Sequence, residues 1–125
     1  MQIIETDNAP EAIGPYAQGI IAKGFLFTSG QIPLDPKTME LAEGGIEEQA
    51  ERVLKNIEAI VKEAGAEKED VVKTTVFLKD LADFQTFNRV YDEFFEGHKP
   101  ARSTVEVANL PKGALLEIEC IAEIS

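Results

Sequence analysis

The segment from Leu116 to Ile124 alternates between two kinds of side chain, and this alternation restricts the fold more than any other feature of the chain. One parity is apolar: Leu116, Ile118, Cys120, Ala122 and Ile124. The other parity is mostly acidic: Glu117, Glu119, Ile121 and Glu123. Successive side chains of a strand point to opposite faces, so the pattern predicts a strand with one apolar face and one acidic face. Other elements must cover the apolar face of the resulting sheet.

Two amphipathic segments are candidates for that cover. Apolar residues recur at helical spacing from Ile46 to Ala64 and stop at Gly65, which is typical of a helix ended by glycine. A second helical pattern opens at Asp80, with Asp83 three positions later. Its expected buried stripe is apolar and largely aromatic: Leu81, Phe84, Phe87, Tyr91, Phe94 and Phe95.

The remaining strands come from three short segments. Residues 17–22 and 25–29 flank Lys23-Gly24, a spacing that predicts a hairpin, and the β-branched run 71–78 predicts a further strand. The resulting order, ββαβαββ, indicates an α+β fold with both helices on the apolar sheet face. Because the other face mixes Ile121 with carboxylates, we expect further subunits to cover it, which would place Glu117 near an interface.

Composition limits the class of protein. The 125 residues, 44% of them hydrophobic, suit one domain spanning 1–125. The sequence contains neither an apolar run of about 20 residues nor an N-terminal targeting pattern, so we expect a cytoplasmic protein without membrane contact. The net charge of −11 argues against nucleic acid as a partner.

Histidine and cysteine are too few for several kinds of chemistry. His98 is the only histidine, which argues against a zinc site or a Ser-His-Asp triad, and we expect no metal. Cys120 is the only cysteine, so an intramolecular disulfide is impossible. Its position on the apolar parity predicts a buried thiol rather than a nucleophile.

Arg102 and the acidic residues downstream carry the clearest chemical signal. An arginine guanidinium can bind a carboxylate through two parallel hydrogen bonds, and a glutamate can move a proton to or from water. Together they suggest hydrolysis of a small carboxylic acid. Alternation alone leaves Glu117, Glu119 and Glu123 as equal candidates for the proton-transfer group.

Four motifs occur together along the chain: Gly14-Pro15-Tyr16, Thr28-Ser29-Gly30-Gln31-Ile32-Pro33, Val72-Lys73-Thr74-Thr75-Val76-Phe77 and Pro100-Ala101-Arg102-Ser103. With them, the sequence closely resembles the RidA family, also called YjgF, over essentially its whole length. The resemblance implies a chorismate-mutase-like fold, in which a mixed sheet carries two helices on one face. It also implies a homotrimer with ligand clefts between neighbouring subunits.

The resemblance further implies an enamine/imine deaminase that needs no cofactor or metal. Such enzymes hydrolyse reactive 2-imino acids, 2-iminobutanoate and 2-iminopropanoate, to 2-oxo acids and ammonia. By likeness to the family, Arg102 binds the substrate carboxylate with help from the Thr104 backbone, and Glu117 activates water. The other residues that match family cleft positions would hold the planar imine: Tyr16, Ser29, Gly30 and Asn88.

The sequence departs from the family pattern in two places. Thr104 stands where many members have cysteine, and the loop 96–99 is shorter than in some members. The loop bears on substrate preference more than on reaction type. Two other functions stay open: a non-catalytic module that binds or senses a small carboxylate, and an endoribonuclease or translation inhibitor.

Overall fold

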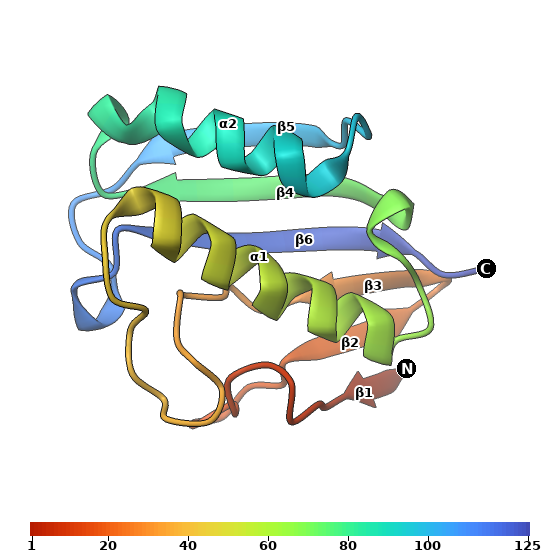
Figure 1. Cartoon of the computed structure of the whole chain (residues 1–125). Coiled ribbons are helices and arrows are strands. Elements are labelled where there is room, and N and C mark those ends of the chain that lie inside the picture. Colours follow the sequence, from red (N-terminus) through yellow and green to blue (C-terminus); the bar gives the residue numbers. More distant parts are fainter.

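The computed structural model describes residues 1–125 and shows one six-stranded sheet with two helices (Figure 1). In chain order the elements are β1 (Gln2–Ile4), β2 (Gly19–Ala22), β3 (Phe25–Thr28), α1 (Ile46–Glu63), β4 (Val71–Leu78), α2 (Phe84–Phe95), β5 (Ala101–Glu106) and β6 (Leu116–Glu123). The strands lie in the order β1-β2-β3-β6-β4-β5. Only the β4–β5 pair is parallel, so the sheet is mixed. The predicted α+β class is confirmed.

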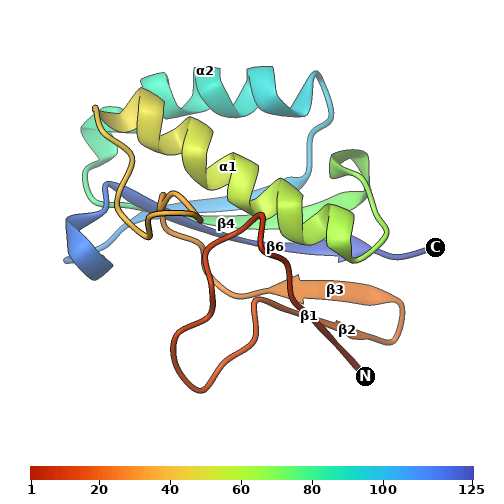
Figure 2. The ribbon, with the colours of Figure 1, turned by 60° about the horizontal axis from the view of Figure 1, so that its bottom comes forward.

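Both helices lie on the same face of the sheet, and no other element covers the opposite face (Figure 2). The apolar parity of β6 points toward the helices, since Leu116, Ile118 and Ala122 are fully buried. They pack in one core with residues of α1 and α2 such as Ile57 and Phe87. The alternation of the last strand therefore predicted correctly which of its side chains the helices cover.

The first helix ends as its sequence predicts. Gly65 has φ +87°, a conformation that glycine adopts without strain. The Gly65 N–H donates to the Lys62 carbonyl at 3.0 Å, and the Ala66 N–H donates to the Val61 carbonyl at 3.1 Å. These two bonds form a Schellman motif and satisfy carbonyls that the helix end would otherwise leave free.

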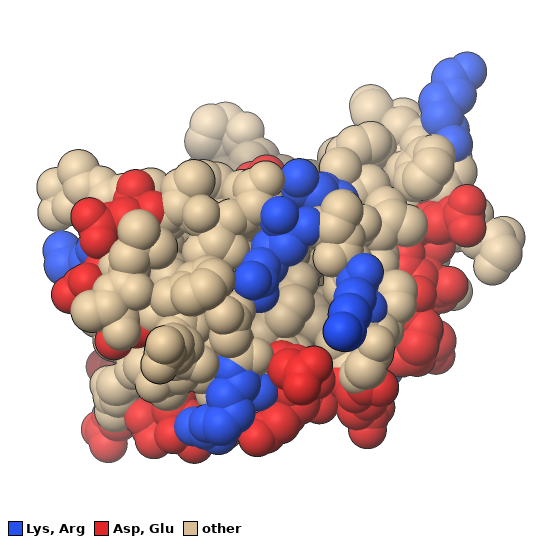
Figure 3. Space-filling view, turned by 90° about the horizontal axis from the view of Figure 1, so that it is seen from above, with Lys and Arg blue, Asp and Glu red and all other residues tan.

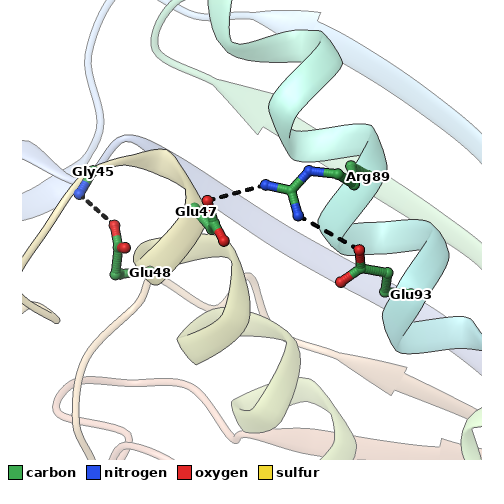
Figure 4. Close-up of polar contacts among 5 residues, drawn as sticks. All are labelled: Gly45, Glu47, Glu48, Arg89 and Glu93. Carbon is green, nitrogen blue, oxygen red and sulfur yellow. Dashed lines mark hydrogen bonds and ion pairs between the residues drawn. The ribbon is translucent and has the colours of Figure 1, made fainter.

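The N-terminal end of α1 is tied to itself and to α2 (Figure 4). The Gly45 N–H donates to Glu48 Oε1 at 2.8 Å, which satisfies one backbone donor before the first turn. Arg89 on α2 forms ion pairs with Glu47 at 3.0 Å and with Glu93 at 3.5 Å. The exposed Arg89–Glu47 pair joins the two helices at the surface, whereas the Arg89–Glu93 pair lies within α2.

The predicted hairpin is present between β2 and β3. Ile21 lies opposite Leu26, and both connecting residues, Lys23 and Gly24, have positive φ. A two-residue turn with two positive φ angles matches the twist of the strands on either side. This turn fixes the register of β2 and β3.

Two expectations about the elements were wrong. The predicted order lacks β1, an edge strand of three residues that is too short to show a periodic pattern. Leu81 was expected in the buried stripe of the second helix but is 48% exposed. It lies in a 3₁₀ turn, Leu81–Asp83, which precedes α2 and does not share its period. The predicted buried stripe is present within α2, where Phe87, Tyr91 and Phe95 are buried.

Neither helix is both long enough and apolar enough to cross a membrane.

Candidate active site

Arg102 lies on β5, the edge strand of the sheet, and its side chain points toward α2. Its position is opposite Thr74 of β4, which is buried beneath the helix. The guanidinium carbon lies 4.8 Å from the ring centroid of Tyr91, 5.5 Å from that of Phe84 and 5.9 Å from that of Phe87. A cation within about 6 Å of an aromatic ring is attracted by the charge distribution of that ring.

The Arg102 guanidinium forms no hydrogen bond and no ion pair within the chain. It lines a cavity of about 390 Å³ whose other lining residues are Asn88, Tyr91, Asp92, His98, Lys99 and Pro100. An arginine carries five N–H donors in a planar fork that matches a carboxylate. Because none of these donors is used within the chain, those that face the cavity can bind a ligand.

Two polar side-chain atoms near Arg102 also lack partners. Asn88 Oδ1 and Thr104 Oγ1 are both buried without a hydrogen bond. Most buried polar atoms in proteins are paired, so an unpaired one calls for an explanation. Asn88 lines the Arg102 cavity, and Thr104 follows Arg102 by two residues on the same face of β5.

The backbone of β5 offers further donors at the free edge of the sheet. The Val107 N–H, just beyond β5, donates to the Leu78 carbonyl at 2.9 Å. In a parallel pair, alternate residues direct their N–H groups to the same neighbour. The N–H groups of Arg102 and Thr104 therefore point away from β4, along the edge that no strand covers. This arrangement is compatible with the predicted backbone role of Thr104.

Glu117 lies on the opposite face of the sheet from Arg102. It is on β6 opposite Phe77, with its side chain on the uncovered face, because its neighbours Leu116 and Ile118 point toward the helices. Burial, and to a smaller extent the charge of Glu119, raise the pKa of the Glu117 carboxyl above its ordinary value. A raised pKa suits a carboxylate that must accept and return a proton near neutral pH.

Gly30 makes room for the Glu117 carboxylate. A Cβ at position 30 would overlap the carboxylate and would lie 2.8 Å from Glu117 Cδ. Beside it, the Ser29 hydroxyl donates to the Ala17 carbonyl at 2.6 Å, which ties the end of β3 to the loop that carries Tyr16. Tyr16 itself is 53% exposed. Gly30 therefore lies against Glu117, and Ser29 beside it ties the loop of Tyr16 to the end of β3.

The predicted site residues thus form two groups within one chain. Arg102, Asn88 and Thr104 form the arginine group, at the edge between α2 and β5. Glu117, Gly30 and Ser29 form the glutamate group, on or beside the uncovered face, and Ser29 ties the loop of Tyr16 to this group. Two strand spacings and three residues along the strand separate the α-carbons of Arg102 and Glu117 by roughly 14 Å. One small molecule cannot contact both side chains of the same chain.

The charges visible at the α2–β5 edge are unevenly distributed. Seen from this edge, Lys and Arg side chains cross the middle of the surface among uncharged residues (Figure 3). Asp and Glu side chains gather along the lower margin, which is the helix side, and toward the left and right ends (Figure 3). An anionic ligand that approaches the middle of this edge therefore meets cations in a chain whose net charge is −11.

The sequence pattern did not reveal the role of the aromatic residues around Arg102. It placed Phe84, Phe87 and Tyr91 in the buried stripe of the second helix, without a link to the arginine. Their helical spacing was visible in the sequence, but their contact with Arg102 depends on how β5 pairs with β4 beneath α2. No local pattern could have revealed it.

The two residues considered for other chemistry are Cys120, which is buried, and His98, which lines the Arg102 cavity. Cys120 is 3% exposed, as predicted, and burial raises the pKa of its thiol to about 12. His98 Nε2 lies 2.7 Å from the Val71 carbonyl oxygen, so the ring donates a hydrogen bond there. No group of three or more His, Cys, Asp or Glu side chains is arranged to hold a metal ion.

Comparison with known proteins shows close relatives over the whole chain. Residues 6–124 match the family model described as Endoribonuclease L-PSP. A Salmonella typhimurium protein named 2-iminobutanoate/2-iminopropanoate deaminase is 55% identical over 95% of this chain and 94% of its own length. Reactive Intermediate Deaminase A, chloroplastic, of Arabidopsis thaliana is 47% identical over 98% of this chain and 66% of its own length.

A solved structure shows the same fold at similar identity. The crystal structure of E. coli TdcF with bound serine superposes with a TM-score of 0.96 at 50% identity, over 100% of both chains. Such identity over full length is evidence of common ancestry as well as of a shared fold. The chain belongs to the Endoribonuclease L-PSP family, the RidA/YjgF family that its motifs resemble.

Proposed function

We propose that this protein is a deaminase that hydrolyses 2-imino acids, such as 2-iminobutanoate and 2-iminopropanoate, to 2-oxo acids and ammonia. The observation that carries the proposal is Arg102, whose unpaired guanidinium lies against three aromatic rings and lines a cavity. Such a cation matches the carboxylate that every 2-imino acid carries. The name of the Salmonella typhimurium relative, at 55% identity, supports the same reaction.

The active site would form between subunits of a homotrimer. One chain keeps Arg102 and Glu117 on opposite sheet faces, so a site with both needs the arginine group of one subunit and the glutamate group of the next. The uncovered face also exposes large apolar side chains: Ile3 is 60% exposed, Phe27 45% and Val105 44%. A face of this kind is suited to burial against another subunit. The resemblance to RidA proteins implies three subunits.

Catalysis would proceed by addition of water and loss of ammonia. Arg102 holds the carboxylate and orients the imine carbon toward a water molecule beside Glu117. Glu117 accepts a proton from this water as its oxygen bonds to the imine carbon. The C=N electron pair moves to nitrogen, Glu117 returns this proton to the nitrogen through water, and a neutral carbinolamine forms. Glu117 then accepts the hydroxyl proton as the carbonyl forms and passes it to the nitrogen as the C–N bond breaks, so ammonia leaves and the carboxylate is regenerated.

The other site residues would position the substrate. Asn88 Oδ1 can accept from the imine nitrogen, and the edge N–H of Thr104 can donate to the carboxylate. Tyr16 can pack on the planar imine from the glutamate side, where Ser29 and Gly30 hold the loop and the carboxylate in place. None of these residues needs to form a covalent bond with the substrate.

The proposal can be tested by trapping unreacted imine. An amino-acid oxidase generates the 2-imino acid in the assay, and semicarbazide captures whatever is not hydrolysed. Wild-type protein should lower semicarbazone formation, whereas Arg102→Ala and Glu117→Ala should not. Arg89→Ala and Glu123→Ala are matched controls, because they change an arginine and an exposed strand glutamate outside the site, and both should keep most of the activity. Absence of a wild-type effect with several imino acids would refute the proposal.

A mixing experiment tests the shared site separately. Arg102→Ala and Glu117→Ala subunits are mixed, unfolded and refolded together. If each site takes one group from each of two subunits, random assembly restores about a quarter of the sites. Recovery of activity in the mixture, compared with each variant refolded alone, would support a site between subunits. No recovery from a mixture shown to contain mixed oligomers would contradict it.

A non-catalytic carboxylate-binding module is the second candidate, because the arginine group is complete without Glu117. The relative whose structure contains bound serine fits this reading as well. Saturable binding of 2-oxobutanoate that Arg102→Ala abolishes, with no imine turnover, would favour the binding module over the deaminase.

A further inference from the structure

We propose that Thr74 and Tyr91 form a buried pair that positions Arg102 for carboxylate binding. The inference rests on the proposed function, because it assigns the residues that hold the substrate-binding arginine. Thr74 and Tyr91 are positioning residues: Tyr91 also lines the cavity, but the effect assigned to both residues acts through Arg102, and neither contributes chemistry of its own.

The pair is fixed between the sheet and the helix above it. Thr74 Oγ1 of β4 and Tyr91 Oη of α2 lie 2.7 Å apart, at hydrogen-bonding distance. Thr74 is 1% exposed and Tyr91 is 7% exposed, so water does not compete for this bond. The bond is the polar anchor that sets where the Tyr91 ring lies over the sheet.

The same bond is next to Arg102. Thr74 is the residue directly opposite Arg102 in the β4–β5 register, so their side chains leave the sheet on the same face. The guanidinium carbon lies closer to the Tyr91 ring, at 4.8 Å, than to either of the two phenylalanine rings. Tyr91 is also the only one of the three rings with a hydroxyl to anchor it.

Neighbouring rings restrict Tyr91 further. Its centroid lies 5.4 Å from that of Phe87 and 4.8 Å from that of Phe95, and both phenylalanines are buried. Arg102 has long, rotatable side-chain bonds and no hydrogen bond within the chain, so ring contacts are what limits its conformations. A shift of the Tyr91 ring would therefore change the contacts of the guanidinium. Arg102 would then be less ordered before binding, and ordering it on ligand binding would cost more conformational entropy.

The test measures carboxylate binding directly as well as turnover. Calorimetry with 2-oxobutanoate, the product of the proposed reaction, gives Kd for wild type, Tyr91→Leu, Tyr91→Phe, Thr74→Val and the Thr74→Val/Tyr91→Phe double variant. Imine trapping gives kcat and KM for the same proteins, and thermal unfolding shows which of them are folded. Phe94→Leu is the matched control, because Phe94 is an aromatic residue of α2 that contacts Lys68 instead of Arg102.

We expect Tyr91→Leu to weaken 2-oxobutanoate binding about tenfold, and the loss of either hydroxyl to weaken it about threefold. The double variant should bind no more weakly than the single variants, since both partners of one bond are then absent. KM should rise with these changes while kcat changes little. Phe94→Leu should lower Tm and leave Kd unchanged.

A folded Tyr91→Leu protein with wild-type Kd would overturn the inference. Additive losses in the double variant would also overturn it, because the two hydroxyls would then act independently. A wild-type protein that binds 2-oxobutanoate without hydrolysing imines would refute the deaminase alone, and the Kd series would still decide the role of the pair. A wild-type protein with neither activity would refute both proposals.

Discussion

Arg89 and Arg102 differ in nearly every aspect of their surroundings. Arg89, on α2, forms ion pairs with Glu47 and Glu93 at the surface. Arg102, on β5, has no acidic partner and lies against three aromatic rings. An arginine that serves the fold has its donors satisfied within the chain. An arginine that serves a ligand is held by contacts that leave its donors free. Packing against neighbouring side chains, instead of hydrogen bonds, then restricts its conformation.

Among the substitutions that test this comparison, we expect Arg102→Lys to have the largest effect, which is a loss of activity. Lysine keeps the charge but loses the planar fork and the stacking on the rings, so kcat/KM should fall about 100-fold. Arg89→Lys keeps its surface ion pairs and should have nearly wild-type kcat/KM. Equal effects of the two substitutions in the imine-trapping assay would break the distinction between the two arginines.

The glutamate group should also be sensitive to a single added methyl group. In Gly30→Ala the new Cβ would displace the Glu117 carboxylate, and we expect kcat/KM to fall about tenfold. Gly45→Ala is the control, because a Cβ at position 45 meets nothing within 4 Å and φ there is −100°. Unchanged activity in Gly30→Ala would show that the observed position of Glu117 is not needed for turnover.

A smaller effect, on stability, is expected for Glu117→Gln. The pKa of Glu117 is higher in the folded protein than in the unfolded chain. The contribution of Glu117 to the free energy of unfolding is therefore full below the unfolded pKa and is lost as pH rises through the folded pKa. Glutamine avoids this loss, so the variant should unfold a few degrees above wild type at pH 7. The difference should disappear near pH 4.

Two further measurements complete the test of Glu117. The charge of the exposed Glu119 raises the pKa of Glu117 less than burial does. Glu119→Gln should therefore give a smaller gain in Tm than Glu117→Gln. The kcat/KM of wild type should fall as pH drops through the raised pKa, because the proposed base must be ionised. A Glu117→Gln protein with a lower Tm than wild type at pH 7 would contradict the pKa argument.

The smallest effect is expected for Arg89→Gln. Its ion pairs are exposed, and such pairs contribute little to stability because water and salt compete for the charges. Tm should fall by less than about two degrees, and by less still in high salt. A drop comparable to that of a core substitution, measured by thermal unfolding, would show that the α1–α2 contact matters more than its exposure indicates.

Several elements could be predicted from the sequence because local rules govern them. The alternation from Leu116 to Ile124 determined which side chains of β6 face the helices, and Gly65 determined where α1 ends. The hairpin turn at Lys23-Gly24 follows from backbone conformation alone. The short strand β1 and the exposed Leu81 were missed, since each lies where a periodic pattern is too short or changes period.

The candidate site shows the same division. The motifs identified the family and with it Arg102, Glu117 and the positions around them, because motif residues are local in sequence. Only the tertiary structure decided that Arg102 and Glu117 lie on opposite faces of the sheet and that Tyr91 lies against the guanidinium. Alternation gives the phase of side chains within each strand, but the relative phase of β5 and β6 depends on the register of both with β4, which is set by long-range packing.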